Sequence, residues 1–75
     1  MEVLLFGRLA EIAGLTALNI DWVKDSDQLK QKVLELFPAI AAIPFRIAVD
    51  KKIISETTTL QASSMVALLP PFSGG

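Results

Sequence analysis

Short blocks of hydrophobic and polar positions follow one another along this chain, and their periods predict strands around one principal helix. The apolar run VLLF at residues 3–6 shows no alternation, which is typical of a strand covered on both faces. Residues 8–14 then predict one or two helical turns that end at Gly14.

Four further segments have the pattern of strands. These are residues 16–22, residues 43–50, the pair Ile53-Ile54 after a turn at residues 50–52, and residues 65–69. The two longer segments alternate, with one face formed by Leu18, Ile20 and Trp22 in the first and by Ile43, Phe45, Ile47 and Val49 in the second. Residues 57–64 are polar and predict an irregular connection.

The clearest helix begins near Asp25. Either Asp25 or Ser26 can cap it, and Gln28 follows Asp25 at the spacing of a capping box. Pro38 ends the helix. Apolar residues at helical spacing predict one buried stripe, formed by Leu29, Val33 and Leu36. Leu34 falls outside this stripe.

This order of elements predicts an α+β fold, a mixed sheet of four to five strands with the main helix across one face. If the last strand lies beside the first, both are central, which explains their apolar runs and gives a β-grasp arrangement. We expect a β-grasp domain at residues 1–69 and an extended tail at residues 70–75.

One helix covers only one face of such a sheet. Alternation along the first and last strands predicts that apolar side chains lie on the other face: Leu4, Phe6, Ala67 and Leu69. An exposed apolar patch of this kind usually marks a protein interface. The alternative is that the connection at residues 57–64 covers it.

The composition restricts the chemistry of the chain. It has 75 residues, of which 52% are hydrophobic and 20% charged, and it contains neither cysteine nor histidine. Disulfides, the common zinc sites and the usual nucleophile–base pairs are therefore excluded, and we expect no metal. Catalysis by carboxylates or lysines stays open in principle. The acidic residues of the chain, however, fall mostly in turns or on polar helix faces, which does not favour catalysis by the chain alone.

Charge and hydropathy argue against nucleic-acid and membrane partners. The formal net charge is −1, and the basic residues form no stripe for nucleic acid. The longest apolar runs are too short to cross a bilayer, and the first residues lack a basic signal-peptide region. We therefore expect no nucleic-acid or membrane partner and a cytoplasmic location.

The chain closes with LLPPFSGG. Two prolines favour an extended conformation that does not fold back as a helix or hairpin. Glycine has no Cβ, so Gly74 and Gly75 can enter a channel too narrow for other residues. The reactive group at such an end is the α-carboxylate itself. A chance Gly-Gly, or a sequence that merely stops there, is the alternative.

Three stretches carry a family resemblance: LLFGRLAEIAG, FRIAVDKKII and VALLPPFSGG. Together they resemble the small subunit of molybdopterin synthase, a ubiquitin-like β-grasp sulfur carrier, and the resemblance covers the whole chain. The Pro-Pro-x-x-Gly-Gly ending is its most specific part. The family often has an Asp-Gly-Asp-type turn before the last strand, where this chain has Ala62-Ser63-Ser64.

The resemblance implies a mechanism. An E1-like adenylating enzyme would use ATP to activate Gly75 as an acyl-adenylate, and sulfur would replace AMP to give a thiocarboxylate. The large synthase subunit, in a heterotetramer, would accept the tail and pass the sulfur to a pterin precursor. The chain itself would bind no cofactor. Residues on the path of the tail would be Gly74, Ser73, Phe72, Pro71 and Pro70, and the docking face would include Phe6, Ile54 and Leu69.

Three other functions stay open. A thiamine-pathway sulfur carrier would share the fold and the Gly-Gly chemistry, although the paired prolines and the FGRLAEIAG stretch favour molybdopterin synthesis. A ubiquitin-like modifier would join Gly75 to lysines of other proteins. Ubiquitin carries arginines just before its Gly-Gly, and this tail has none. The last alternative is a β-grasp interaction module with an inert tail, since a fold alone does not fix function.

Overall fold

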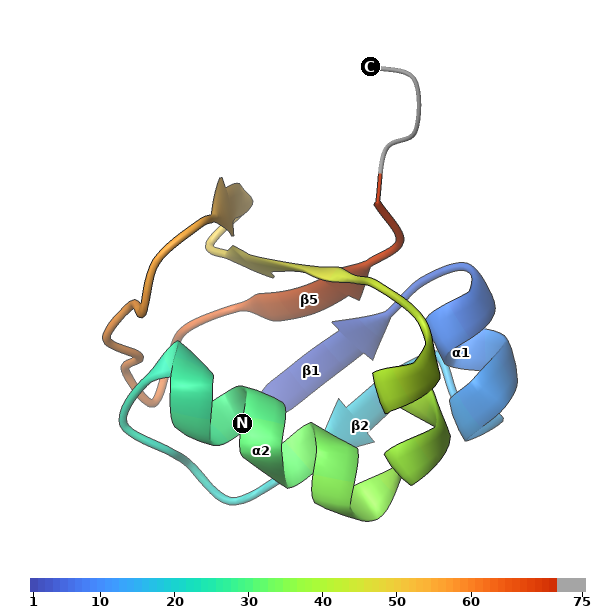
Figure 1. The fold of residues 1–75 in the computed structure, drawn as a ribbon. Coiled ribbons are helices and arrows are strands. Elements are labelled where there is room, and N and C mark those ends of the chain that lie inside the picture. Colours follow the sequence, from blue (N-terminus) through green and yellow to red (C-terminus); the bar gives the residue numbers. More distant parts are fainter. Residues whose placement is uncertain (72–75) are drawn as a thin grey trace.

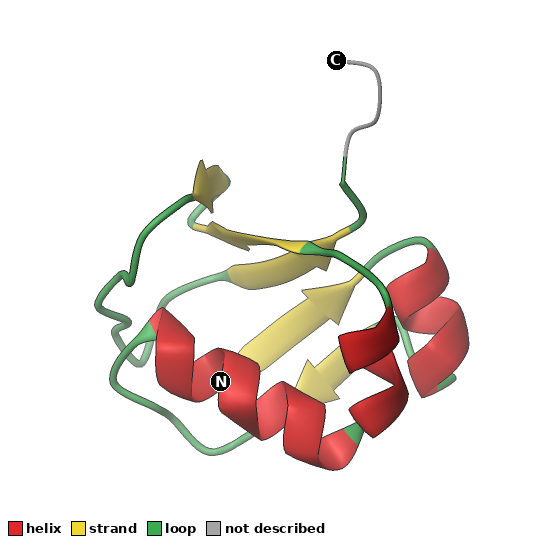
Figure 2. Cartoon of the chain, in the orientation of Figure 1, coloured by secondary structure: helices red, strands yellow, loops and turns green. Residues whose placement is uncertain are grey.

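The computed structural model describes residues 1–71 (Figure 1). Strands and helices alternate in the first half of the described chain, up to the 3₁₀-helix η1 that follows α2, and the second half contributes strands alone (Figure 2). In chain order they are β1 (Glu2–Leu5), α1 (Arg8–Ala13), β2 (Ala17–Asn19), α2 (Ser26–Leu36), η1 (Pro38–Ala42), β3 (Arg46–Val49), β4 (Lys52–Ile54) and β5 (Val66–Leu69).

The strands form one mixed sheet in the order β2-β1-β5-β3-β4. Strands β1 and β5 are parallel, with Leu4 opposite Ala67, and every other neighbouring pair is antiparallel. The last strand therefore lies beside the first, and neither is an edge strand. The α+β fold and its β-grasp arrangement are confirmed.

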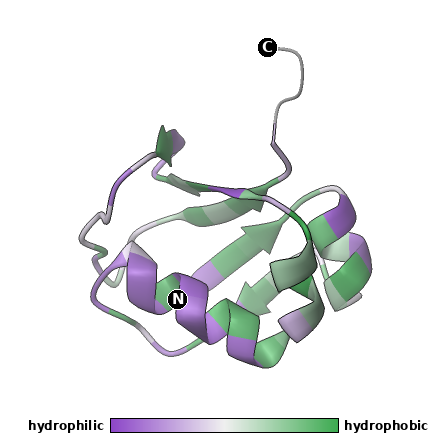
Figure 3. Cartoon of the chain, in the orientation of Figure 1, coloured by the Kyte–Doolittle hydropathy of each residue, from purple (hydrophilic) through white to green (hydrophobic). Residues whose placement is uncertain are grey.

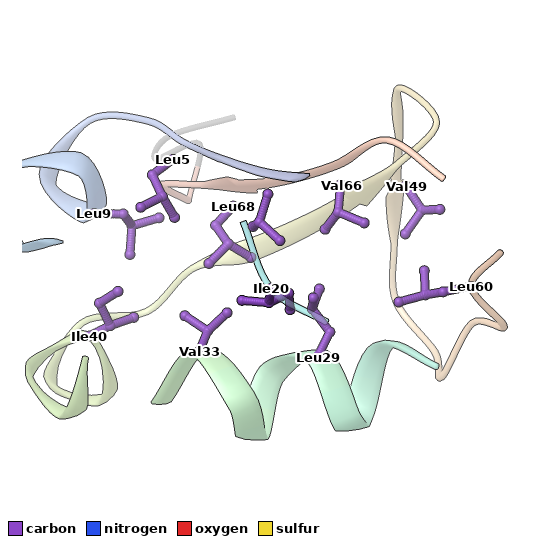
Figure 4. Close-up of a cluster of buried hydrophobic side chains, with 11 residues drawn as sticks. Leu5, Leu9, Ile20, Leu29, Val33, Ile40, Val49, Leu60, Val66 and Leu68 are labelled. Atoms are coloured by element: carbon purple, nitrogen blue, oxygen red, sulfur yellow. The ribbon is translucent and has the colours of Figure 1, made fainter. Parts of the chain in front are cut away.

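Helix α2 lies across one face of this sheet (Figure 1). Its N-cap is Asp25, whose side chain accepts a hydrogen bond from the Gln28 N–H at 2.9 Å, while Gln28 Oε1 accepts from the Lys24 N–H at 3.2 Å. The capping expectation is confirmed with Asp25 as the cap. Leu29 and Val33 are fully buried beneath the sheet (Figure 4).

The prediction that Leu36 completes the buried stripe of α2 is wrong. Leu36 is the last residue of α2 and is 47% exposed, whereas Leu34 is half-buried against the core. The chain continues directly into η1, which packs against both α2 and α1. Ile40 of η1 is fully buried and fills the core at this end, so Leu36 is not needed there.

Strand β2 is shorter than its alternating pattern predicts. It ends at Asn19, although Ile20 stays buried and its N–H donates to the Met1 carbonyl at 2.9 Å. Trp22 lies beyond the end of β2 and is 53% exposed, so the prediction that it shares a strand face with Leu18 and Ile20 is wrong. Its indole N–H donates to the Leu60 carbonyl at 3.2 Å, which holds the ring over the connection before β5. Strand β3 likewise begins only at Arg46, after η1 and Pro44.

The connection at residues 57–64 is irregular, as predicted, and is fastened to the start of α2. The Ser26 N–H donates to the Thr58 carbonyl at 2.9 Å, and the Thr58 N–H donates to Ser26 Oγ at 2.8 Å. The Leu60 N–H donates to the Lys24 carbonyl at 2.8 Å, and the Leu60 side chain enters the core between sheet and helix (Figure 4). This segment therefore completes the helix side of the domain.

Ser26→Ala tests this attachment. Ser26 is 3% exposed, and its loss removes the acceptor of a partly buried N–H, so we expect unfolding to become easier by about 1–3 kcal/mol. Urea denaturation measures the change. Ser63→Ala, in an exposed turn, is the control and should be within about 0.5 kcal/mol of the parent. Equal losses in both variants would contradict the role of Ser26.

Candidate functional site

The sheet face opposite α2 carries a row of apolar side chains. Directly paired residues share a face, so the register aligns Leu4, Ala67, Ala48 and Ile53 across four strands. The strands are apolar along most of their length (Figure 3). We call this surface the open face, and a groove runs over it. The open face is defined by Leu4, Phe6, Ile53, Met65, Ala67 and Leu69.

The open face is accessible. Phe6 is 45% exposed, Ile53 47% and Met65 55%. The connection at residues 57–64 touches this face only at its border, beside Leu4 and Met65, because Leu60 turns into the core on the other side. The expectation of an uncovered apolar face is confirmed for residues 1–71, and the covering alternative is wrong.

Two of the three predicted docking residues lie here, and one does not. Phe6 and Leu69 line the groove. Ile54 pairs with Ile47 and packs against the core, so its predicted place on the open face is wrong. Ile53 takes that place, because side chains alternate along β4. The length of the turn before β4 was the missed signal.

That turn contains two residues, Asp50 and Lys51, with Val49 opposite Lys52. Their φ angles are 51° and 71°, as a two-residue hairpin of type I′ requires. The Asp50 N–H donates to the Met65 carbonyl at 2.8 Å, and Asp50 Oδ1 accepts from the Met65 N–H at 2.9 Å. The turn is thereby fixed to the start of β5, and Lys51 borders the groove.

The base of the tail lies at the other end of the groove. The Phe6 N–H donates to the Leu68 carbonyl at 3.2 Å, and β5 ends at Leu69. Pro70 follows and ends the ladder, as predicted. It lies against Gly7, where φ is +59° and an added Cβ would come within 3.2 Å of Pro70 Cγ. This contact requires glycine and holds the base of the tail next to Phe6.

Pro70 is half-buried and Pro71 exposed. The remaining predicted site residues lie outside the described residues: Phe72, Ser73, Gly74 and Gly75. Within residues 1–71, no group of three or more acidic side chains could hold a metal ion. No helix in that same part of the chain is long and apolar enough to cross a bilayer.

Solved structures of known proteins share this fold. Small archaeal modifier protein 1 from Methanosarcina acetivorans is 23% identical, with a TM-score of 0.83 over 99% of this chain and 94% of that one. A Pyrococcus furiosus protein described as subunit 1 of a molybdopterin converting factor is 18% identical, with a TM-score of 0.83 over 95% of each chain. These two likenesses support the fold.

A third structure is a complex of subunits 1 and 2 of the molybdopterin-converting factor from Helicobacter pylori. The matching chain is 25% identical, with a TM-score of 0.71 over 99% of this chain and 96% of that one. At the level of sequence, the ThiS family model matches residues 3–75. The chain therefore belongs to the ThiS family and has the ubiquitin-like β-grasp fold of its sulfur carriers.

Proposed function

We propose that this chain is the sulfur-carrying small subunit of a molybdopterin synthase. The observation that carries the proposal is the position of the open face directly beside the base of the tail, where Phe6 and Leu69 line the groove and their chain neighbours Gly7 and Pro70 are in contact. A protein that docks on the open face would find Pro70, the base of the tail, at a fixed position. In this proposal the folded domain is the part that successive enzymes bind, and residues 70–75 are the part on which they act.

The apolar character of the open face suits such docking. Phe6, Ile53 and Met65 form an exposed patch on a domain whose sheet is otherwise packed by α2. Aromatic and methionine side chains are enriched at the centres of protein interfaces. Burying them on a partner removes apolar surface from water, which is the main favourable term in association.

The chemistry would take place at Gly75. The α-carboxylate of Gly75 attacks the α-phosphate of ATP on an adenylating enzyme, which releases pyrophosphate and forms an acyl-adenylate. A sulfide-level nucleophile then displaces AMP, so the carbonyl C–O bond breaks and a C–S bond forms. Enclosure in a dry channel would protect the acyl-adenylate from water, and Gly74 and Gly75 would fit a narrow one. The chain supplies the carboxylate, and ATP is bound by the partner.

The large synthase subunit is the proposed acceptor of the tail. The Helicobacter pylori structure is a complex of subunits 1 and 2, and its matching chain covers 99% of this one. Transfer of sulfur to a pterin precursor would take place there. We propose the cytoplasm as the location, since the ATP-dependent activation and the synthase would share a compartment.

A protein modifier is the second candidate. The similarity to small archaeal modifier protein 1 supports it. Both functions begin with an adenylated Gly75 and differ in the nucleophile, which is sulfur for a carrier and a lysine amine for a modifier. A thiamine-pathway carrier would share the thiocarboxylate and differ in the acceptor.

The intact mass after incubation with the adenylating enzyme, ATP and a sulfur source tests the proposal. Replacement of one oxygen by sulfur at Gly75, followed by loss of that sulfur to the large subunit with precursor, is the expected result. Isopeptide adducts on other proteins would support the modifier instead. An unchanged mass with a competent enzyme would overturn both.

Changing Gly74→Val should abolish sulfur transfer without unfolding the domain, because a branched side chain would block a channel built for glycine. One residue added after Gly75 should abolish thiocarboxylate formation by moving the carboxylate. Gly14→Ala, at a left-handed position with no atom within 4 Å of an added Cβ, is the control. It should lower stability by about 1 kcal/mol and leave transfer intact. Full transfer by either tail variant would contradict the mechanism.

Phe6→Asp should raise the dissociation constant for the large subunit by about tenfold or more, because truncating a central interface aromatic usually costs above 1 kcal/mol. Leu36→Asp is a matched control, since Leu36 is 47% exposed on the helix side and Phe6 45% on the open face. Titration calorimetry measures binding, and thermal melting checks the fold. Equal losses of binding in folded Phe6→Asp and Leu36→Asp proteins would contradict the docking face.

A further inference from the structure

We propose that Lys51 is a specificity-determining residue, a fixed cation at the border of the open face that pairs with a carboxylate on the docking protein. This inference rests on the proposed function, because it assigns a partner to the same face. The partner surface would be apolar at its centre and would present an aspartate or glutamate opposite the β3–β4 turn. Three observations support this assignment.

The first is the backbone conformation of Lys51. Its φ of 71° lies in the left-handed region, which glycine adopts freely and a residue with a Cβ adopts only with strain. The second central position of a type I′ turn strongly favours glycine. Lysine at this position makes the domain less stable than glycine would. Backbone strain of this kind concentrates at functional sites.

The second observation is where the turn holds the side chain. Two hydrogen bonds join Asp50 to the Met65 backbone, at 2.8 and 2.9 Å, and so fix the turn against β5. Lys51 lines the groove together with Met65 and Ile53. The next residue, Lys52, lies opposite the buried Val49 and on the same side of β4 as Ile54, so it faces away from the groove.

The third observation is the charge distribution of this face. Glu2 lies on the same face of β1 as Leu4, at the β1 border of the open face. Lys51 lies at the opposite border, in the turn between β3 and β4. The apolar surface between them is therefore flanked by opposite charges. The same face carries a second cation, because Arg46 alternates with Ala48 along β3 and lies opposite Leu69 at the tail end. A carboxylate opposite Lys51 therefore favours a partner whose charges match both ends of the face. Border charges of this kind act mainly on the association rate and on selection against wrong partners.

Lys51→Glu and Lys52→Glu form a matched pair, since both change the net charge equally at adjacent exposed positions. We measure association with the large synthase subunit at 0.01 M and 0.15 M salt, where charges are screened beyond about 30 Å and about 8 Å. Lys51→Glu should slow association about tenfold at low salt, less at high salt. At 0.01 M salt Lys52→Glu should slow association as well, because the long screening length reaches both sites, but at 0.15 M it should change the rate less than twofold while Lys51→Glu still slows it severalfold. Equal rates for the two variants at 0.15 M salt would overturn the assignment.

Lys51→Gly separates the charge from the turn. Removing the strained Cβ should raise Tm by about 4 °C, while association slows because the cation is gone. A more stable variant that docks as fast as the parent would also overturn the role of Lys51. A parent protein that binds neither the large subunit nor the adenylating enzyme would instead overturn the proposed function, and the inference with it.

Discussion

The parallel pairing of β1 with β5 is the interaction on which the rest of the molecule depends. It joins the two ends of the chain at the middle of the sheet, with Val3 opposite Val66 and Leu5 opposite Leu68, all buried. Parallel strands usually have both faces covered. Here α2 covers one face and, in the described part of the chain, the other stays open. The domain therefore carries an internal pair of strands with half of its usual packing, and a docking protein can supply the other half.

The covered side compensates for the small size of the domain. A chain of 75 residues without cysteine has to obtain its stability from packing. Ile40 from η1 and Leu60 from the last connection extend the core beyond what a single helix could fill. The Ser26 and Thr58 hydrogen bonds then hold that connection to the helix. The irregular segments thus stabilise the helix side of the sheet. Because they pack there, they do not cover the open face.

The capped helix and the alternating apolar face could be predicted from local patterns, because they depend on period and caps near in sequence. The central place of the last strand was indicated by its uninterrupted apolar run and by the family resemblance. The failures have a different origin. Whether Ile53 or Ile54 faces outward depends on the two-residue turn at Asp50 and Lys51, since a shift of one residue exchanges the faces of a strand. Leu36 and Trp22 matched their local periods, but their burial depends on how far η1 and the Leu60 segment extend over the core, which no local period contains. The left-handed φ of Lys51 gave no sequence signal at all.

The central position of β5 also has a mechanical consequence. Hydrogen bonds tie β5 to β1 on one edge and to β3 on the other, and after β5 the chain turns away from the sheet through Pro70 (Figure 1). A pull transmitted along the axis of β5 would load both ladders in shear, so many bonds would resist together instead of opening one at a time. The contact between Gly7 and Pro70 further fixes the point where the chain leaves β5. Under the proposed function, an enzyme that pulled the tail in that direction would act against both ladders at once, and the sheet would keep its strand pairing from one partner to the next.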